Sequence, residues 1–158
     1  MKLSIVMPAY NEEKRIGNTL EKYLKFFNDK FGNDFEIYVV LNNTVDNTAG
    51  VINKFMKKYK QLKYIDIKAK IGKGGAVKHG FKILNGDYIG FVDADASTSP
   101  EAYFELYDKI NGYDGIVASR WIKGAKVFPK QSLIRRIASR VFNILVRVFF
   151  GLGIRDTQ

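Results

Sequence analysis

Short apolar runs alternate along this chain with longer segments that repeat apolar residues at helical spacing. The runs are rich in Val, Ile, Leu and aromatic residues, which favour strands, and they cover residues 3–7, 35–41, 62–67, 88–92 and 115–119. Apolar residues spaced three and four apart predict helices at residues 12–27, 49–59, 76–84 and 100–110. Strands that alternate with helices imply crossover connections, so the pattern predicts an α/β fold with a mainly parallel sheet and helices on both faces.

The last apolar segment, residues 132–150, has a different character. It is helical in spacing, has no acidic residue, and contains the four arginines Arg135, Arg136, Arg140 and Arg147. Two interpretations stay open: a basic amphipathic helix that lies on an anionic membrane surface, or a core helix whose covering segment is missing. We therefore expect residues 1–158 to form a single domain that is truncated at its C-terminus, with this helix at its end.

Composition narrows the class of protein. The chain has 158 residues, of which 46% are hydrophobic and 14% aromatic, as in a folded globular domain. It has no cysteine, which excludes a disulfide framework, a thiolate nucleophile and a cysteine-ligated zinc, and which suits the cytoplasm. No apolar stretch is long enough to predict a transmembrane helix, and we expect the N-terminal residues to form the first strand.

The charge points to anionic partners. With 26 Lys and Arg against 16 Asp and Glu, the net charge is +10, which fits a phosphorylated substrate, an anionic membrane surface or a polyanion. The basic residues are spread through helices without an interleaved aromatic platform, so a nucleic-acid-binding module is not favoured and we expect no nucleic acid partner.

Polar loops follow the first four predicted strands, at the edge of the sheet where ligands bind in open α/β folds: PAYNEE, NNTVDNT, KIGKGG and DADAS. In the last of these loops Asp93 and Asp95 stand two residues apart, so their carboxylates can converge on one Mg²⁺ or Mn²⁺, with phosphate oxygens and water completing the shell. Such a pair also occurs by chance, and aspartates cap helices. The apolar strand before it and the neighbouring polar loops favour the metal.

The glycine-rich loop around Lys73, GKGGAVKHG, offers backbone N–H groups, a helix N-terminus and an ammonium group, all suited to phosphate. A flexible glycine turn is the alternative interpretation. The loop is not a Walker A motif, and because it follows the third strand it does not match the dinucleotide fingerprint of an oxidoreductase. Tyr10 could stack on a base, Arg120 could bind a phosphate bidentately, and His79 is expected to be a packing or surface residue.

Five ordered motifs together resemble a known family. They are SIVMPAYNEE, GKGGAVKHGF, GDYIGFVDADAS, ASRWIKG and GIRDTQ, and they span residues 2–158. The set is similar to the inverting GT-A glycosyltransferases that load a sugar onto a polyprenyl phosphate, a family that includes dolichyl-phosphate β-glucosyltransferases and dolichyl-phosphate mannose synthases. The resemblance implies the GT-A nucleotide-diphospho-sugar transferase fold, a Rossmann-like α/β fold.

The resemblance also assigns residues to the donor nucleotide. The P-A-Y-N-E segment of the family cradles the nucleoside, which implies this role for Pro8, Ala9, Tyr10 and Glu12. Many relatives read D-D-G-S after the second strand, with an aspartate that contacts the base. This chain has Asn42 there, which can hydrogen-bond a base but not as an anion, so the identity of the base stays open.

Metal and phosphate roles follow in the same way. The resemblance implies that Asp93 and Asp95 hold the divalent metal and the donor diphosphate, with Ser97 where some relatives have a third ligand. It also implies that arginines clamp the phosphates, which points to Arg120 and to Arg135.

The function expected from the resemblance is metal-dependent transfer of a hexose from a UDP-glucose-like or GDP-linked donor to polyprenyl or dolichyl phosphate, with inversion. An acceptor phosphate is already anionic, so no protein base is needed. The enzyme would be cytoplasmic, peripheral at the cytoplasmic face of the membrane. The alternative is a GT-A enzyme acting on a polysaccharide or other hydroxyl acceptor. That chemistry needs a carboxylate base, and no obvious one follows residue 119 before Asp156.

Overall fold

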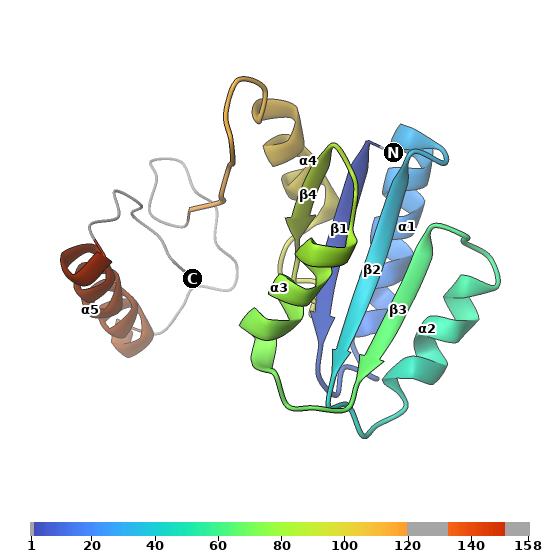
Figure 1. Ribbon diagram of the computed structural model, residues 1–158, viewed down its shortest axis with the longest axis horizontal. Coiled ribbons are helices and arrows are strands. Elements are labelled where there is room, and N and C mark those ends of the chain that lie inside the picture. Colours follow the sequence, from blue (N-terminus) through green and yellow to red (C-terminus); the bar gives the residue numbers. More distant parts are fainter. Residues whose placement is uncertain (1, 120–132, 151–158) are drawn as a thin grey trace. The chain divides into compact units, whose positions relative to one another are not determined.

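The computed structural model describes residues 2–119 and 133–150 (Figure 1). Its strands form one sheet in the order β3-β2-β1-β4, and every neighbouring pair is parallel. The strands are β1 (Leu3–Ala9), β2 (Phe35–Asn42), β3 (Leu62–Ile67) and β4 (Tyr88–Phe91). Because β1 pairs with both β2 and β4, the carboxyl ends of these strands lie side by side at one edge of the sheet.

Helices cover both faces of this sheet, as the sequence predicts (Figure 1). The helices in the described residues are α1 (Ile16–Phe31), α2 (Thr48–Met56), α3 (Gly72–Ile83), α4 (Pro100–Lys109) and α5 (Leu133–Phe150). Apolar side chains of α1, α2 and α4 pack in the larger core on one face, and those of α3 pack against Val6 and Val40 on the other. The predicted α/β class, with a parallel sheet flanked by helices, is thereby confirmed.

The two central strands carry the core. Nearly every residue of β1 and β2 is buried, because helices cover both of their faces; a strand in that position is apolar throughout and does not alternate. On α1 the buried positions repeat at helical spacing, and they are Ile16, Thr19, Leu20, Tyr23, Leu24 and Phe27. Thr19 is the polar member of this buried stripe, and its partner lies in the loop after β4.

The chain divides into two compact units, Met1–Asp108 and Lys109–Gln158. The first contains the whole sheet, and the second contains α5. The predicted fifth strand at residues 115–119 is wrong, since these residues belong to no helix or strand in the structure. A run of apolar and small residues indicates only that a strand could form. The strand itself needs a neighbour for its backbone groups, and composition does not show whether there is one.

Two boundaries differ from the sequence prediction. Helix α1 begins at Ile16 instead of residue 12, and in the segment before it the backbone amides of Glu12 and Glu13 donate to the side chains of Thr48 and Asp46. Helix α3 begins at Gly72, so the predicted glycine loop forms the first helical turn. Glycine has a low helix propensity, but the first turn of a helix needs no intrahelical partner for its N–H groups.

A glycine in α3 marks a close approach of this helix to the sheet. A Cβ atom added at Gly80 would lie 2.6 Å from both γ carbons of Val6, which is fully buried in β1. Val6 is β-branched and sits in a central strand, so it has little room to move. We expect Gly80→Ala to lower the free energy of unfolding by about 1–3 kcal/mol in chemical denaturation.

Gly74→Ala is the matched control for this prediction. It lies in the same helix, with no atom within 4 Å of the added Cβ, and should raise the free energy of unfolding by up to about 1 kcal/mol. Equal stability of the two variants would contradict the close packing of α3 on β1.

Candidate functional site

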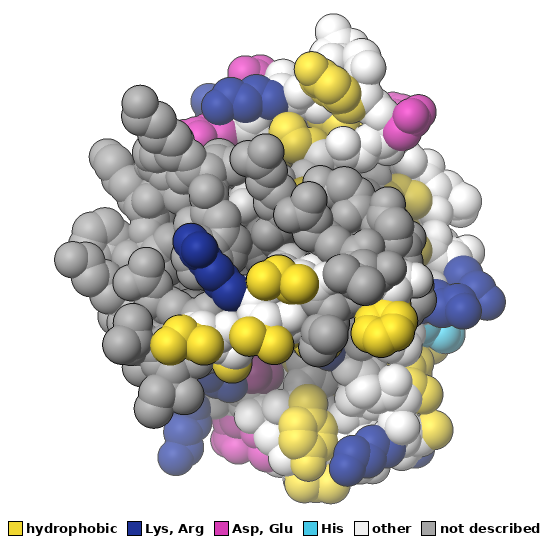
Figure 2. Space-filling view, turned by 90° about the vertical axis from the view of Figure 1, so that its left-hand side faces the viewer, with side chains coloured by type: hydrophobic (Ala, Val, Ile, Leu, Met, Phe, Trp, Pro, Cys, Tyr) yellow, Lys and Arg dark blue, Asp and Glu magenta, His cyan; other side chains and the backbone are white. Residues whose placement is uncertain are grey.

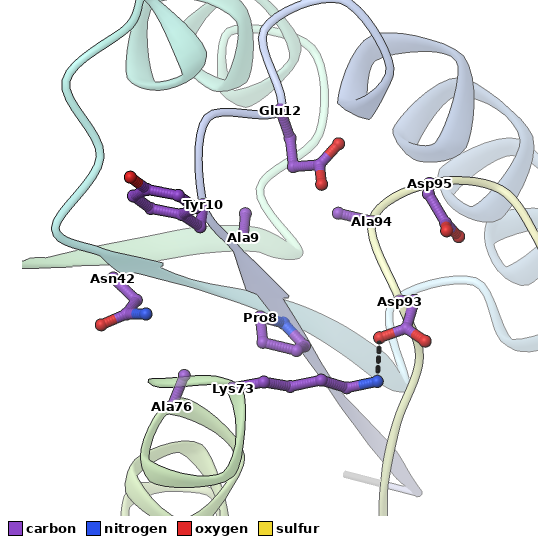
Figure 3. A pocket seen from close by; sticks show the side chains of 10 residues that line it. All are labelled: Pro8, Ala9, Tyr10, Glu12, Asn42, Lys73, Ala76, Asp93, Ala94 and Asp95. Atoms are coloured by element: carbon purple, nitrogen blue, oxygen red, sulfur yellow. Dashed lines mark ion pairs between the residues drawn. The ribbon is translucent and has the colours of Figure 1, made fainter. Parts of the chain in front are cut away.

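A pocket of about 300 Å³ opens at the carboxyl edge of the sheet (Figure 3). It is lined by Pro8, Ala9, Tyr10, Glu12, Asn42, Lys73, Ala76, Asp93, Ala94 and Asp95. All of these except Ala76 and Ala94 are residues that the sequence predicts for the nucleotide-sugar or metal site. They come from the ends of β1 and β2, the first turn of α3 and the loop after β4, and the fold brings them together.

The lining separates into two sides. Figure 3 shows the Tyr10 ring and the Asn42 amide on one side of the pocket, and the carboxylates of Asp93 and Asp95 on the opposite side. In the lower part of this view, the Lys73 side chain extends from α3 to Asp93. An aromatic ring and an amide therefore face a pair of carboxylates with an ammonium beside them.

Each carboxylate of the pocket has a cation nearby. Lys73 Nζ lies 2.6 Å from Asp93 Oδ1 in a partly exposed ion pair. The Arg15 guanidinium forms a bidentate pair with Glu12, through Nε at 2.7 Å and Nη2 at 2.6 Å. Burial alone would raise the pKa of Asp95, but hydrogen bonds from the Ser97 hydroxyl and backbone and the charge of Arg15 outweigh it and lower that pKa. Asp95 is therefore a carboxylate at neutral pH.

The loops after β1 and β2 are joined by a polar network. The Glu12 N–H donates to Thr48 Oγ1 at 2.9 Å, and the Glu13 N–H donates to Asp46 Oδ2 at 3.0 Å. Asp46 Oδ1 in turn accepts the Thr48 N–H at 3.1 Å, and Glu13 Oε2 accepts the Asn47 N–H at 3.2 Å. Asp46 and Thr48 thus hold the backbone from which Glu12 enters the pocket. Sequence reasoning missed both, although an Asp two residues before a Thr at a helix start is a capping signal.

Left-handed backbone conformations occur in the loops at the carboxyl edge of the sheet. Among the residues that the structure describes, the positive φ angles outside glycine belong to Asn11, Asn43 and Ala96, at 53°, 54° and 61°. Asn11, Asn43 and Ala96 lie in the loops after β1, β2 and β4, respectively. Asparagine tolerates this left-handed conformation, whereas alanine rarely adopts it, so the Ala96 turn must be held by its surroundings.

Asn42 lines the pocket and also bonds to the backbone before α3. Its Oδ1 accepts the Ile71 N–H at 2.9 Å, which anchors the backbone just before α3. Because an N–H must meet an oxygen, this bond fixes the orientation of the amide and leaves Nδ2 as the group that can donate to a ligand. Asn42 is therefore a hydrogen-bond donor in the pocket.

The donor set suits a hard divalent cation. Among residues 2–119 and the described side chains of α5, no group of three or more His, Cys, Asp or Glu side chains is placed to hold a metal. Two carboxylates completed by phosphate oxygens and water are, however, the usual environment of Mg²⁺ in phosphate-binding sites. Asp93 and Asp95 fit that chemistry.

Of the remaining predicted residues, those that the structure describes do not line the pocket. Ser97 is not among the lining residues; its N–H donates to Asp95 Oδ1 at 3.0 Å, so its described contact is with a candidate ligand. Arg120 lies outside the described residues, and so does the side chain of Arg135 on α5. Their roles stay predictions. His79 does not line the pocket either.

The parallel sheet flanked by helices, with a pocket at its carboxyl edge, is the fold of the GT-A glycosyltransferases. A solved structure of S. aureus TarS in complex with UDP-GlcNAc is similar, with a TM-score of 0.60 and 29% identity, over 70% of this chain and 31% of that one. The profile of glycosyl transferase family 2 matches residues 4–156, and the chain belongs to this family. The resemblance seen in the sequence motifs is confirmed.

Two curated relatives narrow the likeness. The chain is 33% identical to a dolichyl-phosphate beta-glucosyltransferase of Dictyostelium discoideum over 168 aligned positions, which cover 99% of this chain and 51% of that protein. It is 35% identical to a dolichol-phosphate mannosyltransferase of Pyrococcus furiosus over 128 positions, covering 80% of this chain and 35% of that protein. The chain thus spans about half the length of the first of these relatives. None of the helices in the described parts of the chain is long and apolar enough to cross a membrane.

The network around Asp46 predicts a pH-dependent effect on stability. Burial would raise its pKa, but hydrogen bonds from the Thr48 hydroxyl and the Glu13 and Thr48 amides outweigh it and lower the pKa. The ionised Asp46 carboxylate therefore contributes its full stabilisation of the folded state above the pKa of about 3.9 for an unfolded aspartate. This contribution is lost as the pH falls through the lower pKa of the folded state. In Asp46→Asn one amide N–H must face an NH₂ group, so the free energy of unfolding should fall by about 1 kcal/mol at neutral pH.

Denaturation of both proteins between neutral and acidic pH checks this prediction, and the gap between them should shrink toward acid. Asp29→Asn, at an exposed position on α1, is the control and should show little change at any pH. A gap for Asp46→Asn that does not change with pH would contradict the ionised network.

Proposed function

We propose that this chain is the donor-binding, catalytic part of an inverting glycosyltransferase that transfers a hexose from a UDP-glucose-like nucleotide sugar to polyprenyl or dolichyl phosphate. The observation that supports it most is the pocket, with a base-binding side of Tyr10 and Asn42 opposite a phosphate-binding side of Asp93, Asp95 and Lys73. The similarity to proteins named dolichyl-phosphate beta-glucosyltransferases supports the acceptor class.

The base side suits a nucleoside. The Tyr10 ring is 53% exposed at the pocket, which leaves a face free to stack on a base. Asn42 Nδ2 can donate to a ring carbonyl, since its Oδ1 is already bonded to Ile71. Pro8 and Ala9 form the wall between the two sides.

The phosphate side suits a diphosphate with a divalent cation. Asp93 and Asp95 would hold Mg²⁺ or Mn²⁺, which when bound supplies positive charge that stabilises the departing nucleoside diphosphate. Lys73 lies in the first turn of α3, where N–H groups lack intrahelical partners and favour anions. Its ion pair with Asp93 is partly exposed and hence weak, so the ammonium can move to a phosphate oxygen. Arg120 and Arg135 are the proposed further phosphate ligands.

In the proposed reaction an oxygen of the acceptor phosphate attacks the anomeric carbon of the donor sugar. The new C–O bond forms as the bond to the nucleoside diphosphate breaks, on the opposite face of the sugar, so the configuration inverts. The nucleoside diphosphate leaves with the electron pair. Because the acceptor is already anionic, the step needs no proton transfer to a side chain.

Helix α5 supports a membrane-surface location. Its described exposed side chains include Ile137, Val141, Ile144 and Phe149, whereas Ser139 and Asn143 are buried. Figure 2 shows hydrophobic side chains exposed on one face, with basic side chains near them. A helix with an outward apolar face and basic residues fits an anionic lipid surface. We infer peripheral association at the cytoplasmic face of a membrane.

The donor and the metal can be tested together by thermal shift. UDP-glucose with Mn²⁺ should raise the melting temperature of the chain, since a ligand at a hundred times its Kd stabilises the folded state by about 2.7 kcal/mol. UDP-glucose alone should raise it less, and GDP-mannose is the competing donor. Asp93→Asn and Asp95→Asn should each remove the Mn²⁺-dependent part of the shift, because the cation loses a carboxylate ligand.

Asp87→Asn is the control, since it removes the same charge from an exposed position before β4, at the opposite end of that strand from the pocket. A Mn²⁺-dependent shift that persists in both pocket variants would overturn the metal assignment. No shift with any nucleotide sugar would overturn the donor assignment.

The membrane location can be tested by flotation with phosphatidylcholine vesicles, with and without phosphatidylserine. The chain should float with the anionic vesicles, and Ile144→Asp should reduce the bound fraction at least about threefold, because a charge would enter the apolar face. Val117→Asp places the same charge on another exposed residue of the second unit and should float like the unchanged chain. Equal flotation of Ile144→Asp and the unchanged chain would argue against α5 as the membrane-binding element.

A further inference from the structure

Helix α1 holds the loop that contains Asp93 and Asp95 through two buried hydroxyl groups. Thr19 Oγ1 donates to the carbonyl oxygen of Ala94 at 2.8 Å, and Tyr23 Oη donates to the carbonyl oxygen of Thr98 at 3.0 Å. The exposed fractions of Thr19 and Tyr23 are 0% and 1%. Both bonds join residues 75 positions apart in the sequence, so they connect α1 to the loop after β4.

The Thr19 hydroxyl is committed to this loop and not to its own helix. A threonine inside a helix commonly bonds the carbonyl four residues earlier. Here that carbonyl, of Arg15, lies 3.5 Å from Oγ1, while the Ala94 oxygen lies at 2.8 Å. A hydroxyl has one hydrogen to donate, and the shorter contact takes it.

The loop needs to be held. Ala96 has a φ of 61°, a conformation that alanine adopts only when its surroundings impose it. The Asp95 carboxylate accepts the Ser97 N–H across this turn, which adds a local constraint. The bonds from Thr19 and Tyr23 fix the loop on either side of Ala96, at Ala94 and Thr98.

The Ala94 carbonyl lies between the two candidate metal ligands in the sequence. It belongs to the residue between the two aspartates and to the peptide bond that leads into Asp95. Ala94 is 3% exposed, so its carbonyl oxygen depends on Thr19 for a buried partner. Rotation of this peptide unit would turn the Asp95 side chain relative to that of Asp93.

We propose that Thr19 is a positioning residue for the Asp93 and Asp95 pair: its buried hydroxyl fixes the Ala94 peptide unit and so sets the spacing at which both carboxylates can bind one divalent cation. Thr19 does not line the pocket and would act only through the loop. The inference rests on the proposed function, since it assumes that these carboxylates bind a metal together with a diphosphate.

The test compares variants of the full chain by Mn²⁺ binding in the presence of UDP, measured from the electron paramagnetic resonance signal of free Mn²⁺. Thr19→Val keeps the shape of the side chain but removes the donor, and Thr19→Ala is a second variant without a hydroxyl. Both should weaken Mn²⁺ binding about tenfold, as the loss of an outer-shell partner of a metal site does, whereas Thr19→Ser should stay within about twofold.

Tyr23→Phe is the matched control. It removes the other buried hydrogen bond from α1 to the same loop, four residues further from Ala94, at Thr98. Burial raises the pKa of the Tyr23 phenol well above its usual range, so this hydroxyl is a donor at any ordinary pH. The variant should lower the melting temperature as Thr19→Val does, yet leave the Mn²⁺ affinity within about twofold.

The outcomes separate the two proposals. Unchanged Mn²⁺ affinity in Thr19→Val and Thr19→Ala, or an equal loss in Tyr23→Phe, would overturn the positioning role and leave the metal site in place. If the unchanged chain bound Mn²⁺ with UDP no better than Asp93→Asn does, the proposed metal site would be wrong, and the role of Thr19 with it.

Discussion

Parallel pairing of β1 with both β2 and β4 is the constraint on which the site depends. Ala9 lies opposite Leu41, and Val6 lies opposite Phe91, so the chain leaves these three strands at one edge. The Val92 N–H still donates to the Val6 carbonyl at 3.0 Å, which extends the pairing almost to Asp93. A one-residue shift of register would move each side chain of β1 and β2 from the core on one face of the sheet to the core on the other, so the packing that stabilises the sheet also fixes where the polar loops meet.

Helix α1 connects that core to the loop that contains Asp93 and Asp95. Most of its buried face is apolar and packs on the sheet, where Phe27 contacts the rings of Phe31, Phe35 and Tyr103. The same face carries the hydroxyls that bind the loop after β4. Just before the helix, Arg15 pairs with Glu12, and its charge adds to the Ser97 hydrogen bonds that lower the pKa of Asp95. Helix α1 thus connects the apolar core to the loop that carries Asp93 and Asp95.

The sequence predicts the parts of the site that follow directly from a strand. Asn42 and Asp93 come at or just after an apolar run, and the edge rule for parallel sheets brings such positions together. The contacts of Thr19 with Ala94 and of Asp46 with Glu13 could not be predicted in the same way, because these partners lie far away along the chain. Periodicity places Thr19 on the buried face of a helix but does not say which carbonyl it meets. At residues 115–119 the sequence pattern instead predicts an element that is absent, because this strand-like run forms no strand.

The contacts on the phosphate side differ in how easily they can change. The Ala94 carbonyl and the Thr19 hydroxyl are buried, and breaking their bond would leave two polar groups without water. The ion pair between Lys73 and Asp93 is partly exposed, and water can replace either partner at little cost. A diphosphate that enters with its cation would therefore replace the ion pair between Lys73 and Asp93, while the hydrogen bond from Thr19 to Ala94 would remain. The backbone between the aspartates would stay fixed while the charges around it rearrange, which is the preorganisation that electrostatic stabilisation of a leaving group requires.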